Sequence, residues 1–284
     1  MPVREWKIAR RSLPYGERTL VMGVLNVTPD SFSDGGKFFS FDKAIAHAEQ
    51  MIAEGADIID VGGESTRPGS EFILAEEELK RVVPIIERIN LNSDVPISID
   101  TTKPTVARAA LEAGAGIIND ISGLRFDPAL AAVANSAQAG IVLMHSRGTP
   151  KTMQTLPPVT NIQAEVAGGW RESIAVANRY GVLPESIALD PGIGFGKTVE
   201  QNLELIANLD KLTREFRDFP IMIGTSRKAF IGKLLNNAPA DERLHGSMAS
   251  VVAAVLKGAH IVRVHDVKAA VDAAKMADAV FAAS

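Results

Sequence analysis

The chain has 284 residues, of which 46% are hydrophobic and 23% are charged. This length suits one large domain or two small ones, and the apolar content is that of a globular protein rather than a disordered or fibrous one. The 30 basic residues are outnumbered by 34 acidic ones, which gives a net charge of −4. A protein that binds nucleic acid normally carries a basic excess, so this balance argues against such a function.

The sequence contains no cysteine. Disulfide scaffolds, thiolate zinc sites, iron–sulfur clusters and cysteine nucleophiles are therefore excluded. Arg10 and Arg11 precede an apolar run, as in a twin-arginine export signal, but Glu17 and Arg18 interrupt the pattern and no cleavage site follows. The longest apolar stretches are far shorter than the ~20 residues of a membrane-spanning helix. We expect a soluble, cytoplasmic protein without a membrane partner.

Apolar segments rich in Val and Ile alternate with segments of helical apolar spacing along the chain. Ala44, Ala48 and Met51 fall on one helical stripe, with Asp42 as a candidate N-cap. A second stripe runs through residues 79–86. The predicted strands are Leu20–Val27, Asp57–Gly62, Pro96–Asp100, Gly116–Ile121, Gly140–His145, Ser186–Asp190, Pro220–Gly224 and His260–His265.

A short phrase recurs where a helix is predicted to give way to a strand. It reads Glu-Gly-Ala-Asp-Ile-Ile at 54–59, Ala-Gly-Ala-Gly-Ile-Ile at 113–118 and Lys-Gly-Ala-His-Ile-Val at 257–262. The glycine can adopt the left-handed conformation that ends a helix, and the β-branched pair can begin a strand buried on both faces. Alternation of this kind predicts parallel strands joined by right-handed crossovers.

Eight strand–helix units predict a single (β/α)₈ TIM barrel over residues 1–284, with about residues 1–18 as an N-terminal extension. The alternative is an open doubly wound sheet, but its glycine fingerprint after the first strand is missing. Long irregular stretches follow three predicted strands, where barrel enzymes carry their active-site loops. These stretches are Thr28–Ser40, Glu64–Ala75 and Ser146–Thr160.

Polar residues end most of the predicted strands. A lone charge at the rim of an apolar barrel is unfavourable unless it is paired or hydrogen-bonded, so this repetition predicts one shared site. Any single member can instead cap a helix or pair with a neighbour, and this applies above all to Asp60, which precedes a Gly-Gly pair. The residues are Asn26, Asp60, Asp100, Asn119, His145, Asp190, Arg263 and His265.

Two kinds of chemistry are present among the candidate residues. Carboxylates and an amide suit a flat polar heterocycle, because a carboxylate accepts from two adjacent N–H donors in bidentate fashion. Basic side chains suit an anion. Together they predict a heterocycle that carries a phosphate group. The first set is Asp100, Asn119 and Asp190, and the second is Arg67, Arg263 and His265.

Other motifs in the sequence are weaker. The run from Pro191 to Thr198 ends like a phosphate-binding Walker loop, but Pro191 replaces the first required glycine, so nucleotide hydrolysis is not predicted. Its glycines either let backbone approach a ligand or shape a turn. The histidines lack zinc spacing, and Ser226 lacks the nucleophile-elbow sequence. For His145 we expect a packing role.

The segment Met22–Gly36 resembles the first signature of the dihydropteroate synthase family, and Asp60–Gly69 resembles the second. Further segments of the family pattern follow in order, so the resemblance extends from about residue 20 to 267. These are Ser98–Thr101, Ile118–Gly123, Leu143–His145, Asp190–Lys197, Gly224–Lys228 and Arg263–Val267. Members of the family condense 6-hydroxymethyl-7,8-dihydropterin diphosphate with 4-aminobenzoate, and sulfonamides mimic the aminobenzoate.

The resemblance implies a role for individual residues. Asp100, Asn119, Asp190 and Lys228 are expected to bind the pterin. Asn26, Arg263, His265 and Arg67 are expected to bind the diphosphate, and Asn26 also to help hold Mg²⁺. Phe32, Thr66, Pro68 and Phe195 are expected to form the aminobenzoate pocket. The catalytic residues implied are Asp100, Asp34, Arg67 and Lys228.

The implied reaction is a largely dissociative substitution, because an aromatic amine is a weak nucleophile and gains most from early departure of diphosphate. One position departs from the pattern. Ala229 stands where many relatives have a serine that contacts the aminobenzoate carboxylate. Backbone N–H groups at the start of the next helix can bind that carboxylate instead.

Two alternative functions compete with that of a synthase. A pterin-dependent methyltransferase would not need the first two signatures, both of which are present. A non-catalytic pterin-binding paralogue would be favoured by damage to Asp34, Arg67 or Lys228, and all three are intact. The resemblance also implies a homodimer built on the last helices, for which the Ala-rich stretch Ala269–Ala283 is suited.

Overall fold

The computed structural model describes residues 4–9, 11–28, 37–65, 70, 72–153 and 155–283. Its main sheet has eight parallel strands in the order β8-β7-β6-β5-β4-β3-β10-β9. A bridge between Leu189 and Ile221 joins the two ends of this order, so the sheet closes into a barrel. The strands are β3 (Leu20–Asn26), β4 (Ile58–Gly62), β5 (Ile97–Asp100), β6 (Ile117–Asp120), β7 (Gly140–Met144), β8 (Ile187–Asp190), β9 (Met222–Ile223) and β10 (Ile261–Val264).

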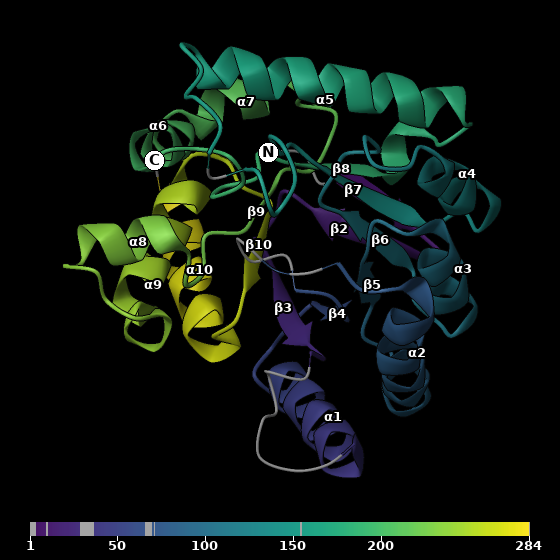
Figure 1. Cartoon of the computed structure of the whole chain (residues 1–284). Coiled ribbons are helices and arrows are strands. Elements are labelled where there is room, and N and C mark those ends of the chain that lie inside the picture. Colours follow the sequence, from purple (N-terminus) through teal and green to yellow (C-terminus); the bar gives the residue numbers. More distant parts are fainter. Residues whose placement is uncertain are drawn as a thin grey trace.

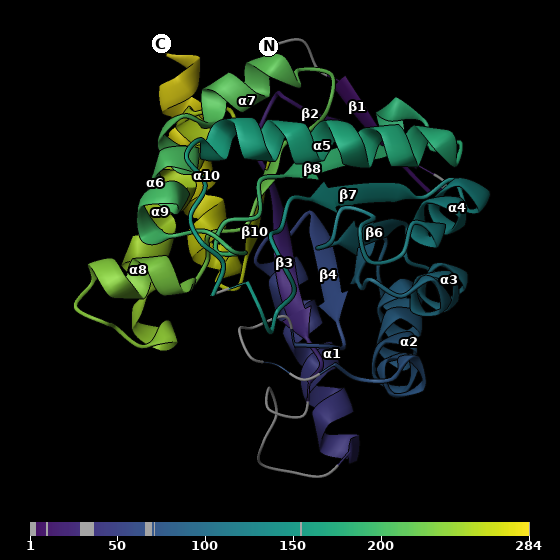
Figure 2. The same ribbon diagram turned by 45° about the horizontal axis from the view of Figure 1, so that its top comes forward.

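Helices surround this barrel, as Figure 1 and the turned view in Figure 2 show. The predicted (β/α)₈ fold is thereby confirmed, and the open sheet is excluded. The helices are α1 (Lys37–Ala53), α2 (Ala75–Asn92), α3 (Pro104–Glu112), α4 (Ala129–Ser136), α5 (Ile162–Arg179), α6 (Val199–Ala207), α7 (Leu209–Glu215), α8 (Ala229–Leu234), α9 (Leu244–Leu256) and α10 (Val267–Ala282), with short 3₁₀ helices at Pro184–Ser186 and Ala240–Glu242.

The recurring glycines end their helices as predicted. Gly55, Gly114 and Gly258 have φ values of +100°, +120° and +92°. At Gly114 the left-handed backbone is combined with tight packing, because an added Cβ would lie 2.3 Å from Asn90 Cγ. Each glycine thus reverses the chain into the strand that follows it.

Three local predictions were wrong. Helix α1 begins at Lys37, so Asp42 lies inside the helix and is not its N-cap, and the irregular stretch predicted to reach Ser40 ends earlier. The seventh strand is only Met222–Ile223, shorter than the predicted Pro220–Gly224. Intrinsic patterns locate elements better than their ends, because end residues are settled by local hydrogen bonding.

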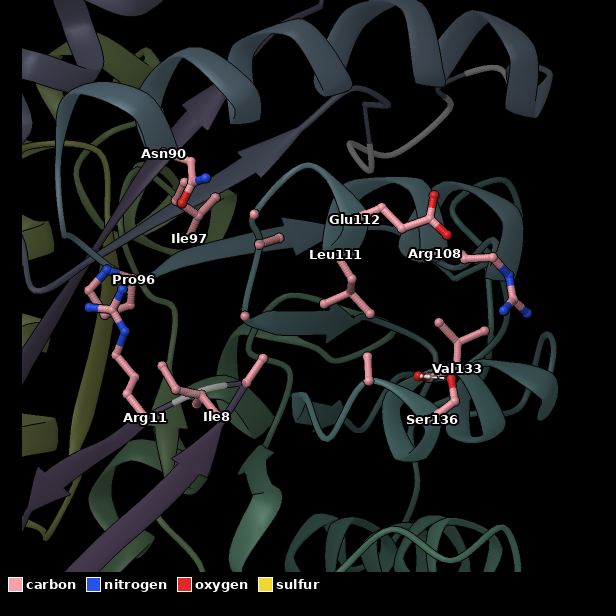
Figure 3. Close-up of a pocket in the computed structure, with 15 residues that line it drawn as sticks. Ile8, Arg11, Asn90, Pro96, Ile97, Arg108, Leu111, Glu112, Val133 and Ser136 are labelled. Carbon is pink, nitrogen blue, oxygen red and sulfur yellow. Dashed lines mark hydrogen bonds between the residues drawn. The ribbon is translucent and has the colours of Figure 1, made fainter.

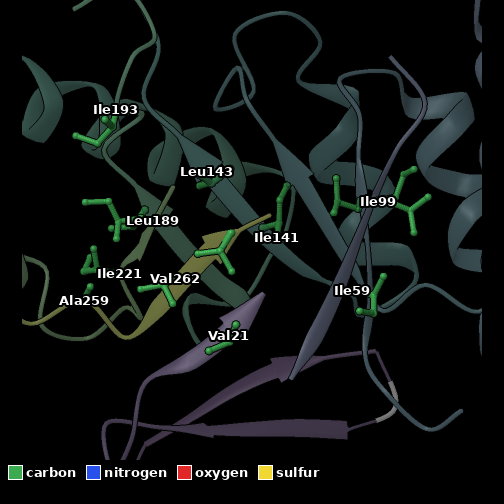
Figure 4. Packing of buried hydrophobic residues seen from close by; sticks show 14 of the residues in the cluster. Val21, Ile59, Ile99, Ile141, Leu143, Leu189, Ile193, Ile221, Ala259 and Val262 are labelled. Carbon is green, nitrogen blue, oxygen red and sulfur yellow. The ribbon is translucent and has the colours of Figure 1, made fainter. Parts of the chain in front are cut away.

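Alternate residues of each strand face opposite sides of the barrel wall. One set, which includes Val21, Ile59, Ile99, Ile141 and Leu189, packs outward with the helices in a continuous core (Figure 4). The other set includes Met22, Ile58, Ile117 and Val142 and fills the interior at the amino ends of the strands. The period of two along a strand is what separates these sets.

A two-stranded hairpin closes the barrel interior at its amino end. It consists of β1 (Arg4–Ile8) and β2 (Arg11–Tyr15), an antiparallel pair absent from the predicted elements. Trp6 is fully buried in the interior cluster, and its Nε1 donates to the carbonyl of Ser186, just before β8, at 3.0 Å. With its amino end filled by apolar side chains, the barrel is open to polar groups only at the carboxyl ends of its strands.

Candidate active site

The register of the strands brings the polar strand ends together. Asn26 of β3 pairs with Gly62 of β4, Gly62 pairs with Asp100 of β5, and Asp100 pairs with Asn119 of β6. An added Cβ on Gly62 would lie 3.6 Å from Asn26 Oδ1 and 3.6 Å from Asp100 Cβ. The glycine therefore leaves space between an amide and a carboxylate that share one layer of the barrel.

Arg263 of β10 joins two carboxylates across the barrel. Its Nε donates to Asp60 Oδ2 at 2.6 Å, and its Nη2 donates to Asp100 Oδ2 at 2.7 Å. Burial lowers the pKa of Arg263, but Asp60 and Asp100 outweigh it and hold that pKa above its ordinary value. The guanidinium is therefore always charged and neutralises part of the buried acid.

Asp60 is fully buried beneath the other polar residues. Its Oδ2 also accepts from Asn119 Nδ2 at 3.0 Å, so one oxygen holds both Asn119 and Arg263. A carboxylate only accepts hydrogen bonds, so it fixes the Asn119 amide with its nitrogen toward Asp60. Within the described part of the chain, Asn119 Oδ1 is buried without a hydrogen-bond donor. The interpretation of Asp60 as a residue that pairs with a neighbouring side chain is confirmed.

The electrostatics of Asp100 follow from these contacts. Burial raises its pKa to about 7, with Arg263 acting to lower it and Asp60 acting to raise it. Asp190 of β8 is also buried, and burial raises its pKa against the opposing effect of Lys228. Its Oδ1 accepts from the backbone N–H of Gly192 at 2.6 Å. Both acids are the last residues of their strands, as predicted.

Lys228, at the N-cap of α8, approaches the same region from the other side. Burial lowers its pKa to about 8, and Asp190 opposes that shift. Its ammonium donates to the carbonyl of Ile193 and lies 4.9 Å from the centre of the Phe195 ring. The residue expected to bind pterin and the one expected to bind aminobenzoate are thus neighbours.

The loop from β8 to α6 is organised by Lys197. Its ammonium donates to the carbonyls of Gly192 at 2.8 Å, Phe195 at 3.1 Å and His145 at 3.2 Å. Gly192 has a φ of +66°, and an added Cβ would lie 1.9 Å from the His145 carbonyl oxygen. The lysine of the Walker-like run is therefore an internal tether, which agrees with the rejection of nucleotide hydrolysis.

His265 and Ser226 form a pair beyond the end of β10. The Nδ1 of His265 lies 3.1 Å from Ser226 Oγ, which also accepts from the His265 backbone N–H at 3.2 Å. Sequence reasoning considered Ser226 only as a nucleophile and missed this positioning contact. The family segment that contains it, Gly224–Lys228, was the available signal.

His145 does not join the other strand-end residues, which corrects its place in the predicted shared site. It packs against Gly169 of α5, where an added Cβ would lie 2.6 Å from His145 Cδ2. Met144 is the last residue of β7. Because side chains alternate along a strand, the His145 side chain lies on the other side of the barrel wall from that of Met144. Burial, with Lys197 nearby, lowers the pKa of His145 to about 2, so it is neutral and has the packing role expected.

Five predicted site residues lie outside the described residues. These are Phe32, Asp34, Thr66, Arg67 and Pro68. A cavity of about 380 Å³ lies at the opposite end of the barrel, where Ile8, Arg11, Asn90 and Arg108 are among its lining residues (Figure 3). It contains none of the predicted site residues. The geometry of the strand ends, rather than this cavity, locates the site.

A family described as "Pterin binding enzyme" matches residues 22–265. The chain is 51% identical to the dihydropteroate synthase of Synechocystis sp., over 94% of this chain and 92% of that protein. It is 49% identical to that of Bacillus subtilis, over 94% of this chain and 90% of that protein. The chain belongs to the dihydropteroate synthase family. It is therefore an enzyme of the transferase class.

Solved structures of the family have the same fold. The dihydropteroate synthase of Clostridium difficile, crystallised in the presence of pteroic acid, has a TM-score of 0.88 at 45% identity, over 94% of this chain and 98% of that one. The Xanthomonas albilineans enzyme with 4-aminobenzoic acid has a TM-score of 0.89 at 41% identity, over 98% of both chains. The TIM barrel and the family resemblance are both confirmed.

None of the helices in the described ranges has the length and apolar character needed to cross a bilayer.

Proposed function

We propose that this protein condenses 6-hydroxymethyl-7,8-dihydropterin diphosphate with 4-aminobenzoate to give 7,8-dihydropteroate and diphosphate. The observation that supports it best is the network in which Arg263 and Asn119 share Asp60 while Arg263 also holds Asp100. This network presents buried acceptors to a heterocycle and a cation to an anion within one barrel mouth.

The pterin has N–H donors along one edge and an electrophilic methylene at the other. Asp190 and Asn119 offer acceptors to that edge. The Nδ2 of Asn119 donates to Asp60, and its Oδ1 has no donor among the described residues, so this oxygen can accept from the pterin. Asp100 stabilises positive charge that grows on the pterin as the leaving group departs. Lys228 completes the pterin site.

In the bond changes that we propose, the methylene carbon–oxygen bond breaks and the electron pair leaves with diphosphate. The amine nitrogen then bonds to the carbon and releases one proton to solvent. Arg263, His265 and Arg67 offset charge on the departing oxygens. Asn26 is the last residue of β3. Exclusion of water from the mouth prevents hydrolysis of the same electrophile.

A magnesium ion fits this site only together with the substrate. The described residues contain no group of three His, Asp or Glu side chains that could hold a metal ion. Asn26 offers a hard amide oxygen, and Mg²⁺ is often held by few protein ligands together with substrate phosphates. When bound, Mg²⁺ would neutralise charge on the diphosphate.

The aminobenzoate pocket is assigned to Phe32, Thr66, Pro68 and Phe195, and Asp34 and Arg67 belong to the same two segments of sequence. Its support in the described residues is the position of Phe195 beside Lys228. Ala229 is the first residue of α8, so backbone N–H groups at this helix start can receive the carboxylate in place of a serine hydroxyl.

The quaternary state is also part of the proposal. Helix α10 exposes Met276 and Val280, with exposed fractions of 65% and 52%, which suits a homodimer formed by the last helices. Sedimentation of the purified protein tests this, and a monomer at working concentration would contradict it. The cytoplasmic location and the organisation of residues 1–284 as one domain stay predictions.

The deciding experiment is a coupled assay of diphosphate release by the purified protein. The proposal expects release that requires both the pterin diphosphate and 4-aminobenzoate, stops without Mg²⁺, and is inhibited by a sulfonamide in competition with aminobenzoate. Release without the amine would instead identify a hydrolase. Pterin binding without any turnover would favour the non-catalytic paralogue.

A further inference from the structure

An ion pair joins two loops at the carboxyl end of the barrel. Arg227 lies between β9 and α8, and Asp266 lies between β10 and α10. The Nε of Arg227 donates to Asp266 Oδ2 at 3.0 Å, and its Nη2 donates to Asp266 Oδ1. Both carboxylate oxygens are engaged by one planar guanidinium, so the contact fixes the relative orientation of the two side chains as well as their separation.

The backbone of Arg227 has a conformation that few residues adopt. Its φ is +58°, in the left-handed region that is unfavourable for a residue with a Cβ. Its N–H donates to Ser247 Oγ at 2.9 Å, and its carbonyl accepts from Arg243 Nη1 at 2.8 Å. Strain of this kind persists only where the surrounding contacts determine the conformation, and it is concentrated at functional sites.

The side chain of Asp266 does not do what its position favours. Asp266 is the N-cap residue of α10, where an aspartate ordinarily accepts from a backbone N–H of the first helical turn. Its side chain makes no such cap hydrogen bond to the described residues and pairs with Arg227 instead. A cap contributes more to stability than a partly exposed ion pair typically does, so stability alone does not explain this choice.

The two loops also carry residues of the candidate site. Lys228 follows Arg227 directly in sequence, and His265 directly precedes Asp266. A second contact joins the same loops, because Ser226 Oγ lies 3.1 Å from His265 Nδ1. The ion pair therefore lies next to a residue assigned to the pterin in one loop and a residue assigned to the diphosphate in the other.

We propose that Arg227 and Asp266 are positioning residues that keep Lys228 and His265 at a fixed separation, so that one molecule of the pterin diphosphate is bound at its heterocycle and at its diphosphate at the same time. The inference rests on the proposed function, because the binding roles of Lys228 and His265 are assigned there. A ligand that contacts two loops binds more tightly when the loops are already in place, since less freedom is lost on binding. Neither member of the ion pair touches substrate in this proposal.

Calorimetric titration of Arg227→Gly and Asp266→Asn tests this link. Glycine tolerates the left-handed backbone but lacks the guanidinium, and asparagine keeps the shape of aspartate without its charge. We expect the Kd of the pterin diphosphate to rise roughly tenfold in both variants. The Kd of 6-hydroxymethyl-7,8-dihydropterin and that of inorganic diphosphate should each change less than about threefold, because each fragment reaches only one of the two loops. A general disturbance of the fold would weaken all three ligands alike.

The double variant provides an internal check. If the two side chains act through one contact, the combination of Arg227→Gly and Asp266→Asn should bind the pterin diphosphate as well as either single variant does. The matched control is Asp272→Asn on α10, because Asp272 pairs with Lys268 at an exposed site. It should leave all three affinities unchanged. Arg227→Lys keeps the positive charge without the planar fork, should give a smaller loss, and serves if Arg227→Gly does not fold.

A second readout does not depend on the substrates. Amide hydrogen exchange of peptides that cover residues 264–267 should become faster in Arg227→Gly, and exchange of residues 225–229 should become faster in Asp266→Asn. Exchange in the barrel strands should stay unchanged in both. If the unsubstituted protein does not bind the pterin diphosphate, the proposed function fails while this exchange test still decides whether the ion pair orders the two loops.

Three results would overturn the inference. The first is unchanged exchange in the opposite loop together with an unchanged Kd for the pterin diphosphate in folded variants. The second is an equal loss of affinity for the whole substrate and for both fragments, which would identify the ion pair as part of the general fold. The third is a double variant in which the two single losses add, because that would show that the two side chains act independently.

Discussion

At the scale of residues, the electrostatics of the site are determined by the small number of cations that neutralise its buried acids. Arg263 contacts Asp60 and Asp100 directly, whereas Lys228 affects Asp190 at longer range. Because Asp100 is buried, its charge is worth more inside the barrel than in water, both as a stabiliser of positive charge and as a cost to folding.

The charge of Asp100 is the first prediction. Asp100→Asn keeps the size of the side chain but removes the negative charge, so kcat should fall roughly 10²-fold or more while the Kd of the pterin changes much less. Steady-state kinetics and calorimetric titration measure the two effects. Ser98→Ala on the same strand is the control, because Ser98 is also buried and faces the interior. Unchanged kcat in folded Asp100→Asn would remove Asp100 from catalysis.

The second prediction concerns pH. The reactive free enzyme needs ionised Asp100, whose pKa is raised to about 7, and protonated Lys228, whose pKa is lowered to about 8. The value of kcat/KM should therefore rise as pH increases through about 7 and fall as it passes about 8. Asp60→Asn removes a like charge beside Asp100 and should move the acid limb to lower pH. A profile that is flat across both limbs would contradict this assignment.

At the scale of elements, the loop from β8 to α6 shows how a charged side chain can organise backbone. Lys197 is satisfied by three carbonyls, and Gly192 lets the chain pass against His145 where a side chain would not fit. The loop places Phe195 next to Lys228 without any regular secondary structure.

The third prediction tests this tether. Lys197→Met leaves three carbonyls without their donor, so the free energy of unfolding should fall by about 2–4 kcal/mol. Urea denaturation measures it. The KM for 4-aminobenzoate should rise as well, because Phe195 loses its anchor. Lys233→Met removes an exposed lysine of α8 and should be near neutral. A stability equal to that of the control would show that the three contacts contribute little.

At the scale of the whole molecule, the two ends of the barrel have different tasks. The hairpin β1–β2 fills the amino end with Trp6, Ile8 and Tyr15, and the carboxyl end holds the polar network. Stability and chemistry are therefore separated along the barrel axis, as in other TIM-barrel enzymes.

The fourth prediction follows from that separation. Trp6→Ala should lower the free energy of unfolding by about 3–5 kcal/mol, because a fully buried ring and its hydrogen bond to Ser186 are lost. Activity per folded molecule should stay near that of the unsubstituted protein at a temperature where both are folded. Denaturant titration and the coupled assay measure these. Leu13→Ala, a partly buried hairpin position, should have a smaller effect, and an equal loss in both would contradict a specific role for the Trp6 side chain.

The barrel could be predicted from the amino-acid sequence, because strand and helix periods and helix-ending glycines are local properties. The residues that end the strands were also predictable, and those of the described part lie at one rim, although the His145 side chain faces α5 on the other side of the barrel wall. The hairpin was missed although Trp6 and Ile8 alternate with polar residues, since strands this short are weak signals.

The partner of each charged side chain, in contrast, depends on the three-dimensional fold. Asp60 and Arg263 are 203 residues apart in sequence, and Lys103 meets Glu64 and Glu78 from a different loop. These pairings depend on the stagger of the closed sheet and on which wall each side chain faces, and both are settled only when the last strand meets the first. Local pattern can identify a buried acid, but the geometry of closure selects the cation that neutralises it.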